Sequence, residues 1–520
     1  MTPKVIPFRR AASDAADRER IAQCLDQSLT VEASAGPGKT TALVERIAKV
    51  LESGRARVQQ LVAVTFTHKA AGELKLRLRQ RLDQQLRAVP RASRPALETA
   101  LRSLEEATIG TIHSFCSQIL RERPVEARVE PLFVEAGPEE RRRLMDRAFG
   151  RWLEERLEVG SIPLKRVLAR HSREGEAPTA KLRRAASEFA EWRDYSAAWT
   201  RPEWHREAAL ETLTRLAENT AERLSTSPTF QPLRTFVQER RRAAARGGQD
   251  DAYREARLIH LRTELLKSRA KLDELNHAMK RFHEDADADL AAGLAQELQL
   301  FLTRYEEIKR QAGRLDFRDQ LIRARDLVRD SPLVRRYLQE RFTHFFIDEF
   351  QDTDPVQAEL FLLLAADDPA ENNWRRVRPA PGKLFLVGDS KQSIYKFRRA
   401  DVRLYTSVCA QLEAAGEARL TLRQSFRAVR PIQGFVNLAF AGVMTGDLSL
   451  GQAAYSPLEE VAPAIEGQPP LVFLDLLDAV NPETAAWRNG ASSRFCPAPW
   501  GSSSIGCFVR ADGACGLHAA

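Results

Sequence analysis

The fold of this chain is decided by one stretch near its start, "LTVEASAGPGKTTALVERIAKVL" (29–51). Its first residues are apolar and β-branched enough to predict a buried strand. The following "TALVERIAKVL" (41–51) places apolar residues at helical spacing. Between the two, Gly36 and Gly38 allow backbone amides to turn toward an anion, and the helix N-terminus adds a partial positive charge. The stretch therefore predicts a strand, a phosphate-binding loop and a helix.

Two side chains in this loop suit a nucleotide with its metal ion. Lys39 has the reach and charge for β- and γ-phosphates, and Thr40 has the hydroxyl that holds Mg²⁺. Ala33 stands where such loops usually carry their first glycine, and a chance glycine-rich turn is the alternative interpretation. The residues expected to contact the nucleotide are Ala33, Ser34, Ala35, Gly36, Pro37, Gly38, Lys39, Thr40 and Thr41.

A second stretch, "RFTHFFIDEFQDTDPVQ" (341–357), places four carboxylates directly after an apolar run. Such a cluster repels itself unless a cation or a reacting group lies there. Asp348 is expected to complete the Mg²⁺ site with the loop threonine, and Glu349 to orient and deprotonate an attacking water. Asp352 and Asp354 are expected to support the site or lie at the surface. A solvated turn after a strand is the alternative.

The composition predicts a large protein without membrane spans. The chain has 520 residues, 43% hydrophobic and 29% charged, which is enough for two to four globular domains. Its net charge of +9 permits a polyanionic partner such as nucleic acid. The six cysteines show neither CxxC pairs nor metal-ligand spacing, and no apolar run reaches signal-peptide or membrane-span length. We expect a cytoplasmic protein with reduced thiols.

The order of elements predicts an α/β fold. Five short β-rich runs each end in a polar motif, and helical patterns separate them, which is typical of a buried parallel sheet. The runs are "LTVEAS" (29–34), "LVAVTFT" (61–67), "ATIGTIH" (107–113), "FFIDEF" (345–350) and "LFLVGD" (384–389). More than two hundred residues separate the third run from the fourth, and they read as helical. We therefore expect an all-helical domain inserted into the α/β one.

Aromatic and basic residues alternate in "LVGDSKQSIYKFRRAD" (386–401). The rings of Tyr395 and Phe397 would stack on bases, while Arg398 would follow the phosphates, as single-strand binding requires. In "VTFTHKAAGEL" (64–74), Phe66 can likewise present a ring to a base. Thr65 and Thr67 offer hydroxyls to a phosphate. The alternative is that these rings belong to the core beside an exposed basic edge.

Taken in order, these motifs resemble those of the UvrD/Rep family of superfamily one DNA helicases. The resemblance spans roughly residues 14–440 and includes "IGTIHSF" (109–115) and "LRQSFRAV" (422–429). "VEASAGPGKT" (31–40) and "RLDFRDQL" (314–321) are most similar to the RecB/AddA branch. The resemblance implies an ATP- and Mg²⁺-dependent helicase or translocase that moves 3′ to 5′ on single-stranded DNA. It also implies action on duplex ends in recombinational repair, beside a second nuclease-helicase subunit of the RecC/AddB type.

The same resemblance assigns roles to individual residues. His113 matches a residue that contacts the DNA backbone, and the amides of Gln351 and Gln392 match groups that sense the γ-phosphate. Arg427 matches an arginine that reaches the γ-phosphate, and Phe426 a ring that stacks on adenine. The sequence departs from the family at two places. Arg18 falls near the place of the family's adenine-reading glutamine, which weakens adenine-specific hydrogen bonding. "QSFRA" (424–428) replaces "NFRS", which alters the hydrogen bonds of the family's Asn and Ser.

The fold class expected from the resemblance is α/β, with a RecA-like P-loop NTPase domain, a large all-helical insertion and the start of a second RecA-like domain. The expected boundaries are 1–125 with 311–415, 126–310 and 416–480, followed by a disordered tail at 481–520. No segments like "SKGLE" or "YVALTRA" follow Arg427, so we expect a truncated or frameshifted chain that does not unwind DNA alone. A non-motor P-loop enzyme such as a kinase, or a binding-only ATPase fragment, are the alternatives.

Overall fold

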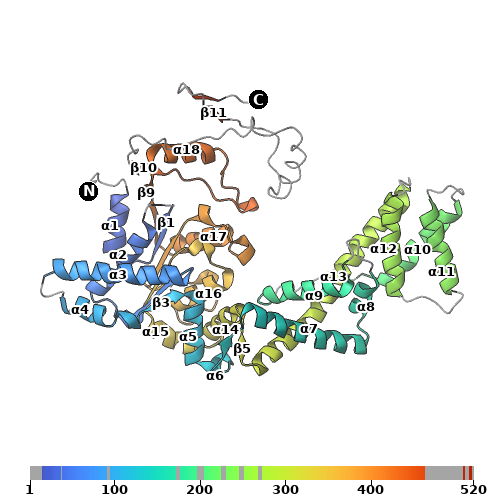
Figure 1. Ribbon diagram of the computed structural model, residues 1–520, viewed down its shortest axis with the longest axis horizontal. Helices are drawn as coiled ribbons and strands as arrows, with labels where there is room; N and C mark the ends of the chain where they lie inside the picture. Colours follow the sequence, from blue (N-terminus) through green and yellow to red (C-terminus); the bar gives the residue numbers. More distant parts are fainter. Residues whose placement is uncertain are drawn as a thin grey trace.

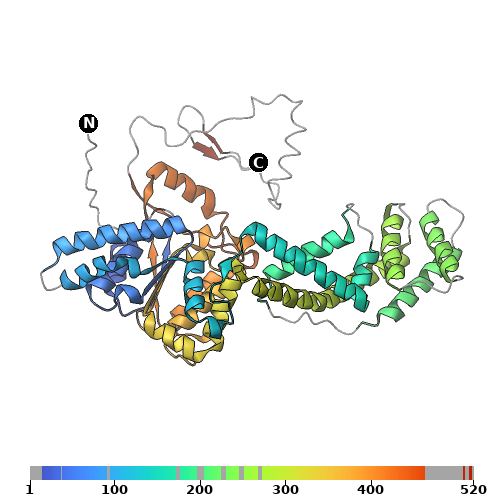
Figure 2. The same cartoon turned by 60° about the horizontal axis from the view of Figure 1, so that its bottom comes forward.

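The structure, a computed structural model, has an α/β body from which a long helical arm projects (Figures 1 and 2). The residues it describes are 14–34, 36, 38–90, 94–170, 176–195, 204–223, 230–244, 251–267, 272–462, 507–509 and 515–517. None of the helices in this described part combines the length and apolar character that crossing a bilayer would require.

The body is built on a six-stranded parallel sheet in the order β3-β2-β6-β7-β1-β8. Its strands are β1 (Leu29–Ala33), β2 (Leu61–Thr65), β3 (Thr108–Thr111), β6 (His344–Ile347), β7 (Leu384–Gly388) and β8 (Ala418–Leu422). Five of them coincide with the β-rich runs, so the predicted α/β class is confirmed. Because β6 and β7 lie between β2 and β1, the chain order reverses at β1. In open parallel sheets a ligand-binding crevice is expected at such a point, at the carboxyl ends of the strands.

The central strands β2, β6 and β7 are buried along their whole length because helices cover both faces of the sheet. Phe345 and Ile347 of β6 face one core, whereas Phe346 between them faces the other. One face carries α1 (Ala15–Gln23), α2 (Lys39–Glu52), α3 (His68–Ala88) and α4 (Arg94–Arg102). The other carries α5 (Ile112–Glu122), α6 (Pro124–Ala127), α14 (Phe317–Asp330), α15 (Pro332–Arg341), α16 (Pro355–Ala365) and α17 (Val402–Ala414).

The predicted helical insertion forms the arm. Its helices are α7 (Pro138–Val159), α8 (Ile162–Ala169), α9 (Pro178–Glu191), α10 (Arg206–Arg223), α11 (Gln231–Ala244), α12 (Asp251–Lys267) and α13 (Asp273–Gln311). The arm has two hydrophobic cores. One, near the body, includes Trp152 and Phe301, and the other, near the tip, includes Leu261 and Phe282. Helix α13 contributes to both cores and so joins the two halves of the arm.

The arm meets the body at a narrow neck. There β4 (Val134–Glu135) pairs in parallel with β5 (Arg314–Leu315), so the chain leaves and returns side by side. The ends of the insertion were expected at 126 and 310, close to this pair. The domain boundaries remain a prediction, but the boundary at 415 falls before β8, which hydrogen-bonds to β1 and completes the first sheet. We therefore place β8 with the first domain.

A second, smaller sheet follows. Strand β9 (Gln424–Val429), helix α18 (Arg430–Ala441) and strand β10 (Glu459–Ala462) form a βαβ unit in which the two strands are parallel. This arrangement is the expected beginning of a second α/β domain. Most of the tail expected to be disordered, 481–520, lies outside the described residues. Within it, β11 (Cys507–Val509) and β12 (Cys515–Leu517) pair as an antiparallel hairpin.

Candidate functional site

The predicted phosphate-binding loop connects β1 to α2 at the crevice. Gly36 and Gly38 have φ of 98° and 90°, the left-handed region that favours glycine. Helix α2 begins at Lys39, so its free amide groups open toward the loop. Thr40 is half-buried and Thr41 exposed in the first turn, whereas Ala35 and Pro37 lie outside the described residues. The loop thus has the backbone conformation and helix terminus that an anion site needs.

The loop lysine meets the acidic motif that follows β6. Lys39 Nζ lies 2.6 Å from Glu349 Oε2, and their side chains are 11% and 33% exposed. Glu349 itself has a φ of 53°, an uncommon conformation for a residue with a side chain. Strain of this kind is most often retained at functional sites. The two residues expected to bind the nucleotide and to activate water are therefore in direct contact.

Two other carboxylates of this motif, those of Asp348 and Asp352, are held in an environment that raises their pKa. Burial, together with the charge of Glu349, raises the pKa of Asp348 to about 6 although Lys39 opposes the shift. The same causes raise the pKa of Asp352 to about 6. Asp348 Oδ1 accepts a hydrogen bond of 3.0 Å from the Glu349 amide. The excess of negative charge predicted from the sequence is therefore present at the crevice.

This excess fits a divalent cation. The pKa of Asp348 is raised. Its Oδ1 accepts one hydrogen bond from the neighbouring amide, and a carboxylate has further lone pairs that can bind a metal ion. Mg²⁺ with a bound nucleotide needs one or two protein ligands, because phosphates and water supply the others. Thr40 is on the first turn of α2, where the sequence expects the second ligand. Among the described residues there is no group of three or more His, Cys, Asp or Glu placed to hold a metal.

Two glutamines link this site to the end of β7. Gln351 Nε2 donates to Glu349 Oε2 at 2.8 Å, and its Oε1 accepts from the Asp389 amide at 2.8 Å. Gln392 Nε2 donates to Asp389 Oδ2 at 2.6 Å. Gly388 makes this approach possible, because a Cβ there would meet Gln351 Oε1 at 2.9 Å. A continuous series of hydrogen bonds thus runs from Glu349 to the loop after β7.

Strand β9 brings the predicted arginine and adenine-stacking ring to the loop. The Phe426 amide donates to the Gly36 carbonyl at 3.1 Å. A Cβ on Gly36 would come within 2.8 Å of Arg427 Cβ, so these backbones are in close contact. The guanidinium of Arg18, on α1, lies 5.6 Å from the centre of the Phe426 ring. The residues assigned to adenine and γ-phosphate therefore lie beside the loop.

Aromatic rings form a row beside the site, at the ends of β2 and β7. The Phe66 and Tyr395 ring centres are 4.7 Å apart, and those of Tyr395 and Phe397 are 5.7 Å apart. Phe397 is 78% exposed and Ile394 is 70% exposed. Phe66 and Tyr395 are half-buried, and a row of partly exposed rings has the form that stacks on successive bases. The side chain of Arg398, assigned to the phosphates, lies outside the described part of the structure.

The two threonines near this row differ. Thr65 is buried and its hydroxyl donates to the Thr67 carbonyl at 3.0 Å, so it does not offer an exposed group to a phosphate as expected. Thr67 is exposed, and its hydroxyl oxygen caps α3 by accepting from the Ala70 amide at 3.0 Å. His113 is half-buried in the first turn of α5 and lies edge-to-face on Phe317, with ring centres 4.7 Å apart.

Comparison with known proteins identifies the family. The UvrD/REP helicase N-terminal domain matches residues 14–412. The chain belongs to the UvrD/REP helicase family.

Similar curated proteins in that family are A subunits of ATP-dependent helicase/nucleases. The one from Desulforudis audaxviator is 29% identical over 88% of this chain and 42% of its own length. Those from Lactobacillus delbrueckii subsp. bulgaricus and Listeria welshimeri are 28% and 26% identical, over 83% and 82% of this chain. They are covered over 40% and 39% of their own lengths. The chain thus spans about two fifths of these relatives, and the resemblance to the AddA branch is confirmed.

Two features of this UvrD/REP helicase chain were missed from its sequence. Phe317, 49% exposed, packs against His113, and its position at the start of an amphipathic helix gives no separate signal. Arg193 and Asp194 follow the end of α9 in a charged stretch of the kind common at protein surfaces. Their side chains are nevertheless buried at the neck. Only the packing of the arm on the body shows their importance.

Proposed function

We propose that this chain carries the ATP-hydrolysing motor of a DNA helicase that moves along single-stranded DNA. One observation carries the proposal. Gln351 joins the Lys39–Glu349 pair to the amide of Asp389, which opens the loop that presents Tyr395 and Phe397. Nucleotide chemistry and strand binding therefore share one loop, as a motor requires. A phosphotransferase has no need of such a connection.

The contacts at the crevice suggest how hydrolysis proceeds. Phosphate oxygens of ATP would replace Glu349 as the partner of Lys39 and release the Glu349 carboxylate to accept a proton from the attacking water. Mg²⁺ held by Thr40 and Asp348 would neutralise charge on the phosphates. Arg427, which lies against the loop, would donate to the γ-phosphate, and Gln351 and Gln392 would respond to its loss.

The finer details rest on the relatives and the motif resemblance. We propose 3′-to-5′ movement, DNA ends as substrates, recombinational repair as the process, and the cytoplasm as the compartment. The relatives are named as one subunit of a helicase/nuclease, which supports a second subunit in the assembly. We propose that this second subunit is of the nuclease-helicase RecC/AddB type. Arg18 and Phe426 would hold the adenine between them.

The test is ATP hydrolysis by purified residues 1–520, with and without an unstructured single-stranded oligonucleotide. We expect stimulation by the strand, and loss of hydrolysis in both conditions for Lys39→Ala because the cation that neutralises the phosphates is removed. A rate that is indifferent to DNA would favour a non-motor P-loop enzyme. Binding of ATP without turnover would favour a binding-only fragment.

Strand separation is a distinct question. Residues 422–520 contain no segment like the family's later motifs, one of which carries another arginine for the γ-phosphate. We propose that residues 1–520 alone bind ATP and single-stranded DNA but do not unwind a 3′-tailed duplex. Robust ATP-dependent unwinding by this chain would contradict that statement without touching the motor assignment.

A further inference from the structure

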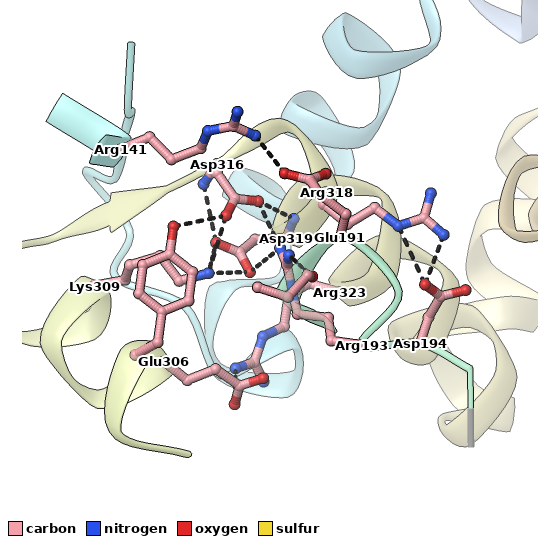
Figure 3. Close-up of polar contacts among 12 residues, drawn as sticks. Arg141, Glu191, Arg193, Asp194, Glu306, Lys309, Asp316, Arg318, Asp319 and Arg323 are labelled. Atoms are coloured by element: carbon pink, nitrogen blue, oxygen red, sulfur yellow. Dashed lines mark hydrogen bonds and ion pairs between the residues drawn. The ribbon is translucent and has the colours of Figure 1, made fainter. Parts of the chain in front are cut away.

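The neck between arm and body contains a buried group of charged side chains, which we call the neck cluster (Figure 3). Four cations face four carboxylates, so the cluster is electrically balanced. They are Arg193, Lys309, Arg318 and Arg399, with Asp194, Asp316, Asp319 and Asp354. Their side chains are between 2% and 12% exposed. Charges this deep are tolerated only when they are paired and hydrogen-bonded.

One half of the cluster fixes the arm to α14. Arg193 donates to Asp316 at 2.6 Å and to Asp319 at 2.7 Å, and Lys309 Nζ lies 2.5 Å from Asp319 Oδ2 (Figure 3). Asp316 and Asp319 also cap α14 reciprocally. Burial alone would raise the pKa of Asp316, but Arg193 and Lys309 lower it below its ordinary value. This half is a structural anchor.

The other half connects the nucleotide motif to the strand-binding loop. One terminal nitrogen of Arg318 donates a hydrogen bond to the carboxylate of Asp354. Asp354 is the last carboxylate of the motif after β6 and the N-cap of α16. The other terminal nitrogen of Arg318 lies 2.7 Å from Asp194 Oδ1. The two oxygens of Asp194 also accept from Arg399, at 2.5 and 2.8 Å. Asp194, an arm residue, is therefore the acceptor shared by two arginines of the body.

Arg399 gives an independent sign that this connection matters. It follows Phe397 by two residues and has a φ of 71°, a conformation that a non-glycine residue adopts at a cost. In that conformation its guanidinium forms the fork with Asp194 and lies 4.5 Å from the centre of the Trp192 ring. The backbone is thus held in a costly state while the side chain reaches into the arm.

We propose that Asp194 and Arg399 are positioning residues that transmit strand binding to the ATP site through the arm. The route runs from the loop of Phe397 through Arg399, Asp194 and Arg318 to Asp354. It is separate from the direct hydrogen bonds of Gln351. A bound strand would shift the loop of Phe397, and the Arg399–Asp194 pair would pass this shift to the arm. Through Arg318 and Asp354, the arm would in turn change the position of α16 and of the carboxylate motif that precedes it. This inference rests on the proposed motor function.

The test uses a substitution that the backbone favours. Arg399→Gly removes the link and relieves the positive φ, and Arg318 still pairs with Asp194. The protein should therefore still fold, with some loss of thermal stability from the broken buried ion pair. We expect ATP hydrolysis without DNA to stay at the parent rate. Stimulation at saturating oligonucleotide should fall about five-fold or more, the scale of a typical coupling between sites. Asp194→Asn, which retains the shape of the side chain, should reduce stimulation in the same direction.

The matched control is Arg128→Gly. Arg128 also has a positive φ, 54°, and is exposed at the end of α6. It borders the anchoring half of the cluster, beside Lys309 and Asp319, but it lies outside the route from Arg399 to Asp354. Arg128→Gly should leave stimulation unchanged. The inference is overturned if Arg399→Gly keeps the parent's stimulation at saturating DNA, whether or not its DNA affinity changes. A parent chain that DNA does not stimulate would overturn the proposed motor function, and this inference with it.

Discussion

At the scale of single residues, Glu349 is the side chain whose change should separate binding from turnover. It touches Lys39 at 2.6 Å and Gln351 at 2.8 Å, so in the proposed motor it would lie beside the phosphates without being required to hold them. Glu349→Gln should bind a fluorescent ATP analogue as the parent does, while phosphate release falls about 10²–10⁴-fold. Lys39→Ala should lose both. Turnover at the parent rate in Glu349→Gln would assign the base elsewhere.

The titration of Asp348 should make the unfolding free energy depend on pH. Its folded pKa of about 6 lies above the ordinary value of an unfolded aspartate, because it is buried beside Glu349. The folded protein therefore loses stability through this group as pH rises from about 4 to about 6, when the folded carboxyl must ionise. At pH 7.5, urea unfolding of Asp348→Asn should give an unfolding free energy about 2–3 kcal/mol larger than that of the parent. The difference should shrink toward pH 4. An equal gain at both pH values would show that charge is not the cause.

At the scale of elements, the close packing of β7 against the motif after β6 holds the residues of the candidate site in place. A Cβ at Gly388 would meet Tyr405 Cε2 at 2.8 Å and Gln351 Oε1 at 2.9 Å. Gly388→Ala should cost about 1–3 kcal/mol of unfolding free energy, as other overpacked cores do. Gly72→Ala, on the open side of α3 with nothing within 4 Å, should instead stabilise by about 0.5–1 kcal/mol. Denaturant unfolding of both variants measures the contrast.

At the scale of the whole molecule, segments far apart in the chain join into one row of rings, which is the proposed strand-binding surface, on a chain of net charge +9. Phe66→Ala and Phe397→Ala should each weaken binding of single-stranded oligonucleotides by about 1–3 kcal/mol, with little dependence on base sequence. The salt dependence should stay unchanged, because neither variant removes a cation. Fluorescence anisotropy over a salt series measures both quantities. Parent-like affinity in both variants would show that these rings do not contact the strand.

The sequence predicted what depends on local pattern. Strands β2, β6 and β7 are buried on both faces, so each is a mainly apolar run that ends in a polar motif. Strand β8, "ARLTL", is only partly buried at the sheet edge, and nothing local distinguishes it from the start of a second domain. The nucleotide loop follows from spacing. The burial of Thr65 and the pairing of Asp194 with two arginines follow from tertiary packing, which spacing does not reveal.

The length of α13 has a mechanical consequence. Its 39 residues make a rod of about 58 Å, at 1.5 Å per residue. Near one end, Tyr305 and Lys309 are held among the charges of the neck, and at the other end Met279 and Phe282 lie in the core of the tip (Figure 2). A tilt of about 5° at the neck would swing the far end by about 5 Å. A small rotation at the neck would therefore displace the tip by a much larger distance. The distance between a fluorophore on the tip and one on the body would report rearrangements too small to detect at the candidate site itself.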